Sequence, residues 1–180
     1  DVAREAAGLV LVHDDFAAIV DAVALGRRIY DNLRNAFGYI VAVHIPIAGV
    51  SLASALLGWG ALLAPAHVVF LELVIDPACS VVFEMEPAAD DVMRRPPRAA
   101  DAPLFDAARL GAAVTQGAVA LAATLFAVHR ARAGGAPAEA QRAVAFVTLV
   151  LANLAILVAS RAGERPFWTA LGRKNPAAAA

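Results

Sequence analysis

The sequence predicts an all-α membrane protein, in which a bundle of four transmembrane helices follows a short cytoplasmic strand and stalk segment. Hydrophobic residues make up 61% of the 180 residues and charged residues 17%, whereas a soluble domain carries about 25% charged residues. The charges also leave three long gaps, which lie between Arg34 and Glu72, between Arg109 and Arg130, and between Arg142 and Arg161. A helix needs roughly 20 apolar residues to cross a bilayer, and each gap is near or above that length.

Residues 1–34 differ in character from the rest of the chain and form the first predicted unit. The apolar run LVLV at residues 9–12 is β-prone, so we expect it to end a strand. Apolar side chains such as Ile19, Val23 and Ile29 then alternate with charged ones at helical spacing. This part therefore predicts an amphipathic cytoplasmic stalk that leads into the membrane.

Residues 35–160 are expected to form the membrane domain, and residues 161–180 a cytoplasmic tail. The predicted spans run roughly over residues 36–57, 66–83, 110–128 and 143–159. Gly58, Gly60 and Pro65 mark a tight turn between the first two spans, where Trp59 suits the membrane interface. Twelve of the 15 Lys and Arg residues then lie on the stalk side, so the positive-inside rule places both ends in the cytoplasm.

Composition excludes some classes of function. No basic stripe is present that would bind nucleic acid. Cys79 is the single cysteine of the sequence, which rules out an internal disulfide and a cysteine-based metal cluster. The opening residues, DVARE, indicate a piece of a longer protein.

Two carboxylates inside the second predicted span are the strongest sign of chemistry. Glu72 and Asp76 are four residues apart and would share one face of an α-helix. Each carboxylate near mid-membrane costs about 2.5–3.5 kcal/mol on insertion scales, and a bound cation would offset both penalties. Pro77 leaves the carbonyl of Leu73 without a helical donor, which adds an oxygen ligand. The alternative is that one carboxylate is protonated and packs against a polar neighbour.

Other polar residues within the spans are weaker candidates. His44 could be a metal ligand, a proton carrier or a hydrogen-bond partner of Glu72 or Asp76, or only a neutral histidine satisfied within its helix. Pro46 would free the carbonyl of Ala42 near His44. Asn153 in the fourth span is a further candidate ligand, although polar amides often only tie helices together.

Four motifs in order resemble P-type ATPases of the calcium and sodium–potassium pump group. DVAREAA (residues 1–7) with LVL (9–11) is similar to the end of their phosphorylation domain, and GRRIYDNLR (26–34) to the stalk of their fifth transmembrane helix. FLELVIDP (70–77) resembles the sixth helix, and DVMRRPPR (91–98) the loop after it. Residues 106–180 fit the seventh and eighth helices by position and pattern only, and the last two helices of a ten-helix pump would be missing.

The resemblance implies a pump that hydrolyses ATP through an aspartyl-phosphate and moves cations across a membrane. In such pumps the fourth, fifth, sixth and eighth helices supply the ligands, and the matching positions here are Asp76, Glu72, His44 and Asn153. The phosphorylated Asp-Lys-Thr-Gly motif, the actuator's Thr-Gly-Glu and the nucleotide domain are absent from the sequence. No residue here is therefore catalytic, and Mg-ATP is expected to bind the remaining domains of the same pump, outside these 180 residues.

Departures from the calcium pumps leave the transported ion open. Ile47 stands where they carry a Glu, Ile75 where they carry a Thr, and the carboxylate of Glu72 is gained. Calcium is the first expectation, but a single ion per cycle, manganese or a proton would also fit. Two other classes remain as alternatives: a passive channel or secondary transporter, and a structural membrane module without transport. The expected location is a multi-pass position in the lipid bilayer of a bacterial plasma membrane.

Overall fold

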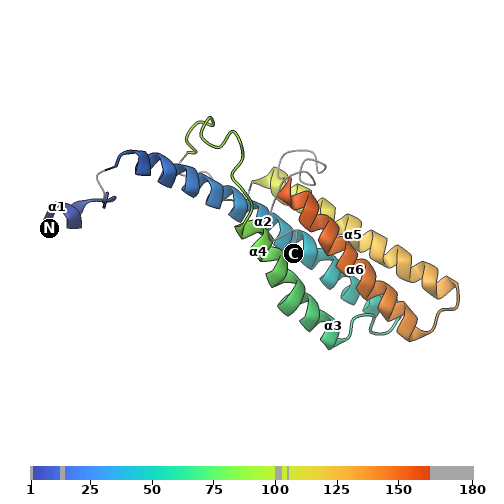
Figure 1. The fold of residues 1–180 in the computed structure, drawn as a ribbon. Helices are drawn as coiled ribbons and strands as arrows, with labels where there is room; N and C mark the ends of the chain where they lie inside the picture. Colours follow the sequence, from blue (N-terminus) through green and yellow to red (C-terminus); the bar gives the residue numbers. More distant parts are fainter. Residues whose placement is uncertain (1, 13–14, 100–102, 105, 163–180) are drawn as a thin grey trace.

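The computed structural model describes residues 2–12, 15–99, 103–104 and 106–162, with the backbone alone at residues 3, 74–76 and 78. Figure 1 shows an elongated molecule, in which one long helix runs from a protruding N-terminal arm into a bundle of neighbouring helices. A short helix, α1 (Val2–Ala6), lies at the tip of this arm. The described part is otherwise helices and loops.

The long helix α2 (Ala17–Leu56) forms the axis of the molecule. Its 40 residues would extend for about 60 Å, which is about twice the hydrocarbon thickness of a bilayer. The stalk and the first predicted span are therefore one continuous helix. It ends at Leu57, whose N–H donates to the carbonyl of Ala53, and Gly58 follows with φ of +63°, a conformation that glycine adopts without steric cost.

The second predicted span is an interrupted helix. It consists of α3 (Pro65–Phe70), a π-helical turn η1 (Leu71–Ile75) and α4 (Asp76–Glu84). Proline suits the first position of α3, because its missing N–H is not needed there. A π-turn widens the backbone spacing and is commonly found at functional sites. Pro77, which cannot donate to the carbonyl of Leu73, lies just beyond this turn.

Three of the described helices are long and apolar enough to cross a membrane: α2, α5 (Ala107–Ala133) and α6 (Ala138–Arg161). Residues 65–84 are helical throughout, but none of their three pieces alone has that length. The chain is thus an integral membrane protein with three candidate spans and one interrupted helix beside them (Figure 1).

The predicted strand was wrong. Residues 9–12 adopt no regular structure, and the described residues hold no strand with which they could pair. A β-prone run forms a strand only when a neighbouring strand takes up its backbone N–H and carbonyl groups. Val10 and Val12 of this run are exposed instead.

Helix α5 begins at a well-formed cap. The carboxylate of Asp106 accepts a hydrogen bond of 2.8 Å from the backbone N–H of Arg109 and pairs at 2.5 Å with Arg34 of α2. The hydrogen bond from Arg109, together with the positive charge of Arg34, lowers the pKa of the Asp106 carboxyl. This contact fixes the start of α5 against the stalk.

Helices α2 and α5 approach each other closely because two glycines lie at their contact. A Cβ atom on Gly117 of α5 would lie 2.6 Å from the backbone oxygen of Ala42 and 2.8 Å from Cβ of Ile45. A Cβ atom on Gly49 of α2 would lie 2.5 Å from a methyl carbon of Leu121. Small residues at such positions let membrane helices pack backbone to backbone.

The interior of the bundle consists of two apolar clusters at different depths. The cluster nearer the stalk joins α2, α4, α5 and α6 through Tyr39, Ala42, Val43, Cys79, Val82, Phe83, Ala113, Ala120, Ile156 and Leu157. The other lies toward the α2–α3 and α5–α6 connections and contains Ile47, Val50, Leu62, Leu71, Val128, Ala145 and Leu149.

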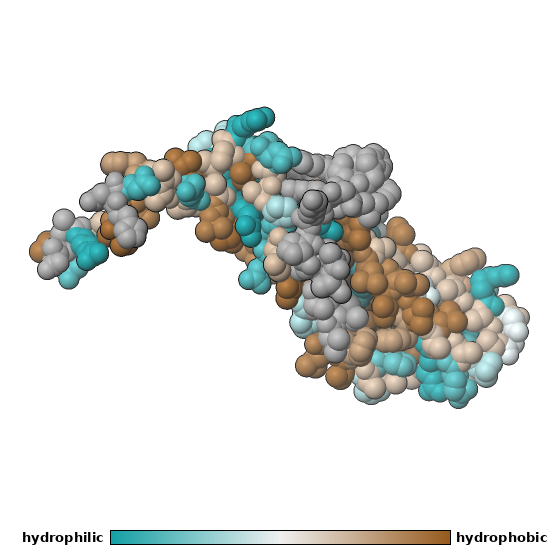
Figure 2. All heavy atoms as spheres, viewed as in Figure 1, coloured by the Kyte–Doolittle hydropathy of each residue, from teal (hydrophilic) through white to brown (hydrophobic). Residues whose placement is uncertain are grey.

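The outer surface of the bundle is apolar. Leu52 is 61% exposed and Phe126 66% exposed, and Figure 2 shows hydrophobic side chains over much of the visible face of the bundle. Soluble proteins rarely expose large contiguous apolar patches. These side chains are therefore placed for contact with lipid or with further membrane helices.

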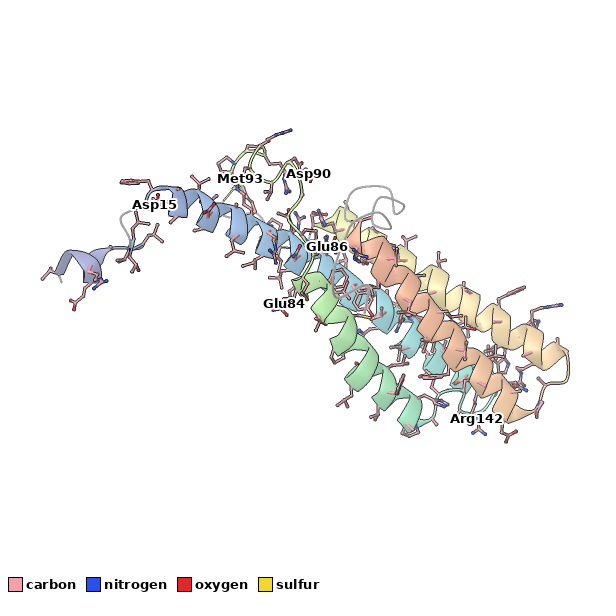
Figure 3. The ribbon with its side chains drawn as sticks, viewed as in Figure 1. Asp15, Glu84, Glu86, Asp90, Met93 and Arg142 are labelled. Atoms are coloured by element: carbon pink, nitrogen blue, oxygen red, sulfur yellow. The ribbon has the colours of Figure 1, made fainter. Side chains whose placement is uncertain are left out.

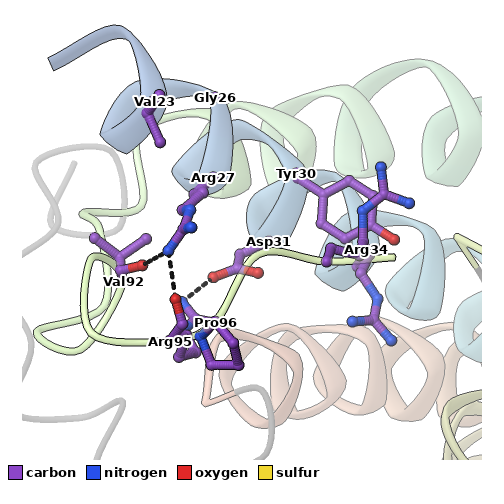
Figure 4. A pocket seen from close by; sticks show the side chains of 10 residues that line it. Val23, Gly26, Arg27, Tyr30, Asp31, Arg34, Val92, Arg95 and Pro96 are labelled. Carbon is purple, nitrogen blue, oxygen red and sulfur yellow. Dashed lines mark hydrogen bonds and ion pairs between the residues drawn. The ribbon is translucent and has the colours of Figure 1, made fainter. Parts of the chain in front are cut away.

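The loop after α4 folds back along the stalk. Arg27 of α2 donates hydrogen bonds of 2.8 and 2.7 Å to the carbonyls of Val92 and Arg95, and Arg95 pairs with Asp31 at 2.6 Å (Figure 4). Tyr30 lies nearby, with the guanidinium of Arg98 4.4 Å from the centre of its ring. The loop that contains the motif DVMRRPPR (91–98) is thus held by the stalk motif GRRIYDNLR (26–34).

Candidate cation-binding site

The structure brings together two of the four predicted ligands. Nε2 of His44, on α2, lies 3.4 Å from Oε2 of Glu72, on the π-turn η1. These side chains come from the first and second predicted spans, which is the arrangement expected from the sequence. Their side chains are 48% and 38% exposed on the surface of this chain.

The hydrogen bond at Nδ1 of His44 determines whether Nε2 is free to accept a proton or a metal ion. Nδ1 lies 2.7 Å from the backbone oxygen of Ile40. A carbonyl oxygen only accepts, so Nδ1 carries a proton and donates. In a neutral imidazole Nε2 then presents a lone pair, and it faces the oxygen of Glu72. Two acceptors at this distance need a proton or a metal cation between them.

The backbone next to Glu72 is unusual for a membrane span. Glu72 is the second residue of the π-turn Leu71–Ile75, and Pro77 leaves the carbonyl of Leu73 without its helical donor. Irregular backbone at membrane depth is tolerated where it is buried in protein or lines a cavity. The π-turn also alters the prediction for Asp76, which assumed α-helical spacing from Glu72; the side chain of Asp76 lies outside the described part.

The carbonyl freed by Pro46 lies at a helix–helix contact. The oxygen of Ala42 lies against Gly117 of α5, where any Cβ atom would be 2.6 Å away. Ala42 is fully buried. This carbonyl therefore lies at the α2–α5 contact.

Asn153 of α6 occupies the buried side of the bundle. It is fully buried, and neither Nδ2 nor Oδ1 has a hydrogen-bond partner among the described residues. Its neighbours along α6 pack on α2 at both ends: Ile156 belongs to the cluster with Val43, and Leu149 to the cluster with Ile47. Asn153 thus lies near the depth of His44, but no described hydrogen bond joins it to His44 or Glu72.

The predicted set is therefore only partly assembled within the described residues. His44 and Glu72 are in contact, Asn153 is separate, and the described part contains no group of three His, Cys, Asp or Glu side chains suited to a metal. A buried ion pair between Glu86 and Arg161 was not predicted from the sequence. Their separation of 75 residues leaves no local pattern that could have indicated the contact.

Proteins of a known family are similar in sequence to this chain. A family model described as the C-terminus of cation-transporting ATPases matches residues 60–179, which is more than half of the chain. The chain belongs to the cation-transporting ATPase family. It corresponds to the C-terminal membrane part of these pumps, as the resemblance in the stalk, in the interrupted helix and in the loop after it had implied.

Individual relatives agree with this assignment. The chain is 30% identical over 161 residues to a calcium-transporting ATPase of Listeria monocytogenes, covering 89% of this chain and 18% of that protein. It is 36% identical over 159 residues to a calcium-transporting ATPase of Bacillus subtilis, covering 86% and 17%. An endoplasmic reticulum calcium ATPase of Aspergillus fumigatus is 36% identical over 126 residues, covering 70% and 13%. The chain thus spans less than a fifth of the length of these relatives.

Proposed function

We propose that this chain is the transport part of an ATP-driven pump that moves a divalent cation, calcium in the first instance, out of the cytoplasm of a bacterium. Residues 65–84 act as a fourth membrane span, which the π-turn opens at the cation site. ATP, with Mg²⁺, is hydrolysed through an aspartyl-phosphate in domains outside these 180 residues. Two of the three relatives described above are bacterial proteins named for calcium transport.

The observation that carries this proposal is the contact between His44 and Glu72. A cation placed between Nε2 and Oε2 receives one ligand from each of two helices and removes the repulsion between two facing acceptors. The carbonyls of the π-turn supply further oxygen ligands, which calcium prefers. The imidazole nitrogen is a softer ligand than an oxygen, so manganese is the alternative cargo.

The remaining ligands of the site are Asp76 and Asn153. Asp76 follows Glu72 by one turn of an interrupted helix, and its carboxylate adds the second negative charge that a divalent cation needs. The amide of Asn153 is buried without a hydrogen-bond partner among the described residues, which is costly, and a ligand or an ordered water would remove that cost. Further membrane helices of the full-length pump are expected to cover the exposed side of His44 and Glu72, which gives the cation an enclosed site.

Replacing Glu72 by Gln tests the proposal. In the full-length pump, Glu72→Gln should raise the calcium concentration for half-maximal phosphorylation from ATP by more than about tenfold, since even residues that only support a metal ligand have effects of that size. Glu84→Gln is the matched control, because Glu84 is an exposed carboxylate at the far end of α4 (Figure 3). Labelled phosphoenzyme measured against calcium and against manganese gives both curves.

An unchanged calcium and manganese dependence in Glu72→Gln would remove Glu72 from the site. Phosphorylation from inorganic phosphate, which requires no bound cargo ion, serves as the check that the variant is folded. A shift in the manganese curve alone would retain the site and change the proposed cargo.

A further inference from the structure

A buried ion pair ties the end of α6 to the beginning of the loop that follows α4. Nε of Arg161 lies 2.9 Å from Oε2 of Glu86, and their side chains are only 7% and 3% exposed. Arg161 is the last residue of α6, and Glu86 follows α4 by two residues. Ala162, which follows Arg161 directly, is also buried. This pair is therefore enclosed between two helix ends that are far apart in the sequence.

The same loop residue is also held by the stalk. Nδ2 of Asn32, on α2, donates a hydrogen bond of 2.9 Å to the backbone oxygen of Glu86, and both residues are buried. Arg28, one turn earlier on α2, is directed to the carbonyl of Glu84 at 3.3 Å. Glu86 thus joins three elements: the stalk through its backbone and α6 through its side chain, at the end of α4 (Figure 3).

Such a pair is an unusual way to hold a helix end in place. Two well-packed apolar residues commonly stabilise a fold as well as a buried ion pair does, because the charges must be stripped of water. What the pair adds is a defined geometry, since a guanidinium and a carboxylate interact well only in particular orientations. Removal of one of the two charged side chains leaves the other as an uncompensated buried charge. These properties suit a contact that fixes a position.

The helix that is fixed in this way carries Asn153. Arg161 follows Asn153 by eight residues on the same helix, which is about 12 Å along its axis. A shift or rotation imposed at Arg161 is therefore carried through two turns of a packed helix to the buried amide of Asn153. Asn32, at the other end of the connection, lies on the helix that carries His44 twelve residues further on.

We propose that the Asn32–Glu86–Arg161 connection positions α6 relative to the stalk, so that movement of the stalk changes the place of Asn153 at the cation site. Glu86 and Arg161 are positioning residues, which act on the cation through α6 and not by contact with it. This inference rests on the proposed function, because the role of Asn153 as a cation ligand is part of that proposal.

Arg161→Gln and Glu86→Gln in the full-length pump provide the test. Each should raise the calcium concentration for half-maximal phosphorylation from ATP by about fivefold or more, the lower range of coupling between two sites. Phosphorylation from inorganic phosphate should persist. The exchanged pair, Glu86→Arg with Arg161→Glu, should recover a substantial part of the calcium affinity. The control is Arg142→Gln on the same helix, where Arg142 forms a surface pair of 3.4 Å with Glu139 (Figure 3).

Each outcome decides between positioning and plain structure. An unchanged calcium dependence in both single variants would overturn the inference. Loss of both phosphorylation reactions in the singles and in the exchanged pair would assign the residues to folding alone and would overturn it as well. If the parent protein itself shows no cation-stimulated phosphorylation, the proposed function fails first, and the two failures are thereby distinguished.

Discussion

Asp76→Asn should abolish cation-stimulated phosphorylation of the full-length pump by ATP, while phosphorylation by inorganic phosphate survives. A cation shifts a pump toward its ATP-reactive state only because it binds that state more tightly. Asn offers a dipole where a divalent cation needs a charge, so most of this difference in affinity is lost. The measurement is labelled phosphoenzyme formed from ATP over a range of calcium concentrations.

The stalk variant Arg28→Ala provides the comparison for Asp76→Asn. Arg28 is partly buried and directed to the carbonyl of Glu84 at the end of α4, and it lies outside the predicted spans. We therefore expect slower turnover in Arg28→Ala with little change in calcium dependence. A normal calcium dependence in Asp76→Asn would place the cation elsewhere in the pump.

Gly117→Ala should destabilise the bundle, by about 1–3 kcal/mol as is typical of overpacking. The new Cβ atom would lie 2.6 Å from the oxygen of Ala42 and 2.8 Å from Cβ of Ile45, so α2 and α5 must separate. Backbone atoms cannot move aside as a flexible side chain can. Thermal unfolding of the 180-residue chain in detergent, followed by circular dichroism, measures the loss.

Gly111→Ala on the same helix is the control, because here the same substitution should not lower the stability. No atom lies within 4 Å of a Cβ atom at Gly111. Because Ala is favoured over Gly inside a helix by up to about 1 kcal/mol, this variant should be as stable as the parent or more so. Equal unfolding temperatures for the two variants would show that α2 and α5 do not meet at Gly117.

The helices could be predicted from the sequence because their cause is local. The charge-free stretches that follow Arg109 and Arg142 are long enough to span a bilayer, and α5 and α6 cover them and extend beyond both ends of each. The continuity of α2 through the stalk also follows from local pattern, since no strong helix-breaking signal separates residues 17 and 45.

The errors came from interactions that the local pattern does not contain. A strand at residues 9–12 requires a partner strand, which the described residues do not supply. The π-turn before Asp76 changes a spacing that was interpreted on α-helical geometry. The close approach of the Ala42 carbonyl to Gly117 likewise could not be read from the sequence, because the two residues lie on different helices.

The candidate site was predicted in part for the same reason. His44 and Glu72 could be paired in advance because both interrupt apolar spans that are adjacent in the sequence, and they are in contact. Asn153 was named from its polarity within a span, but its depth and its complete burial follow from packing between α6 and α2. Glu86 and Arg161 gave no signal, since each is an ordinary charged residue at the end of an apolar segment.

The most direct measurement is uptake of radioactive calcium into inside-out membrane vesicles that contain the full-length protein. A pump predicts accumulation against a gradient that requires ATP and that is lost in Asp76→Asn. Calcium entry that only follows its gradient, with or without ATP, would assign a passive conductance. Absence of ATP-dependent uptake of both calcium and manganese by folded parent protein would contradict a role in divalent cation pumping.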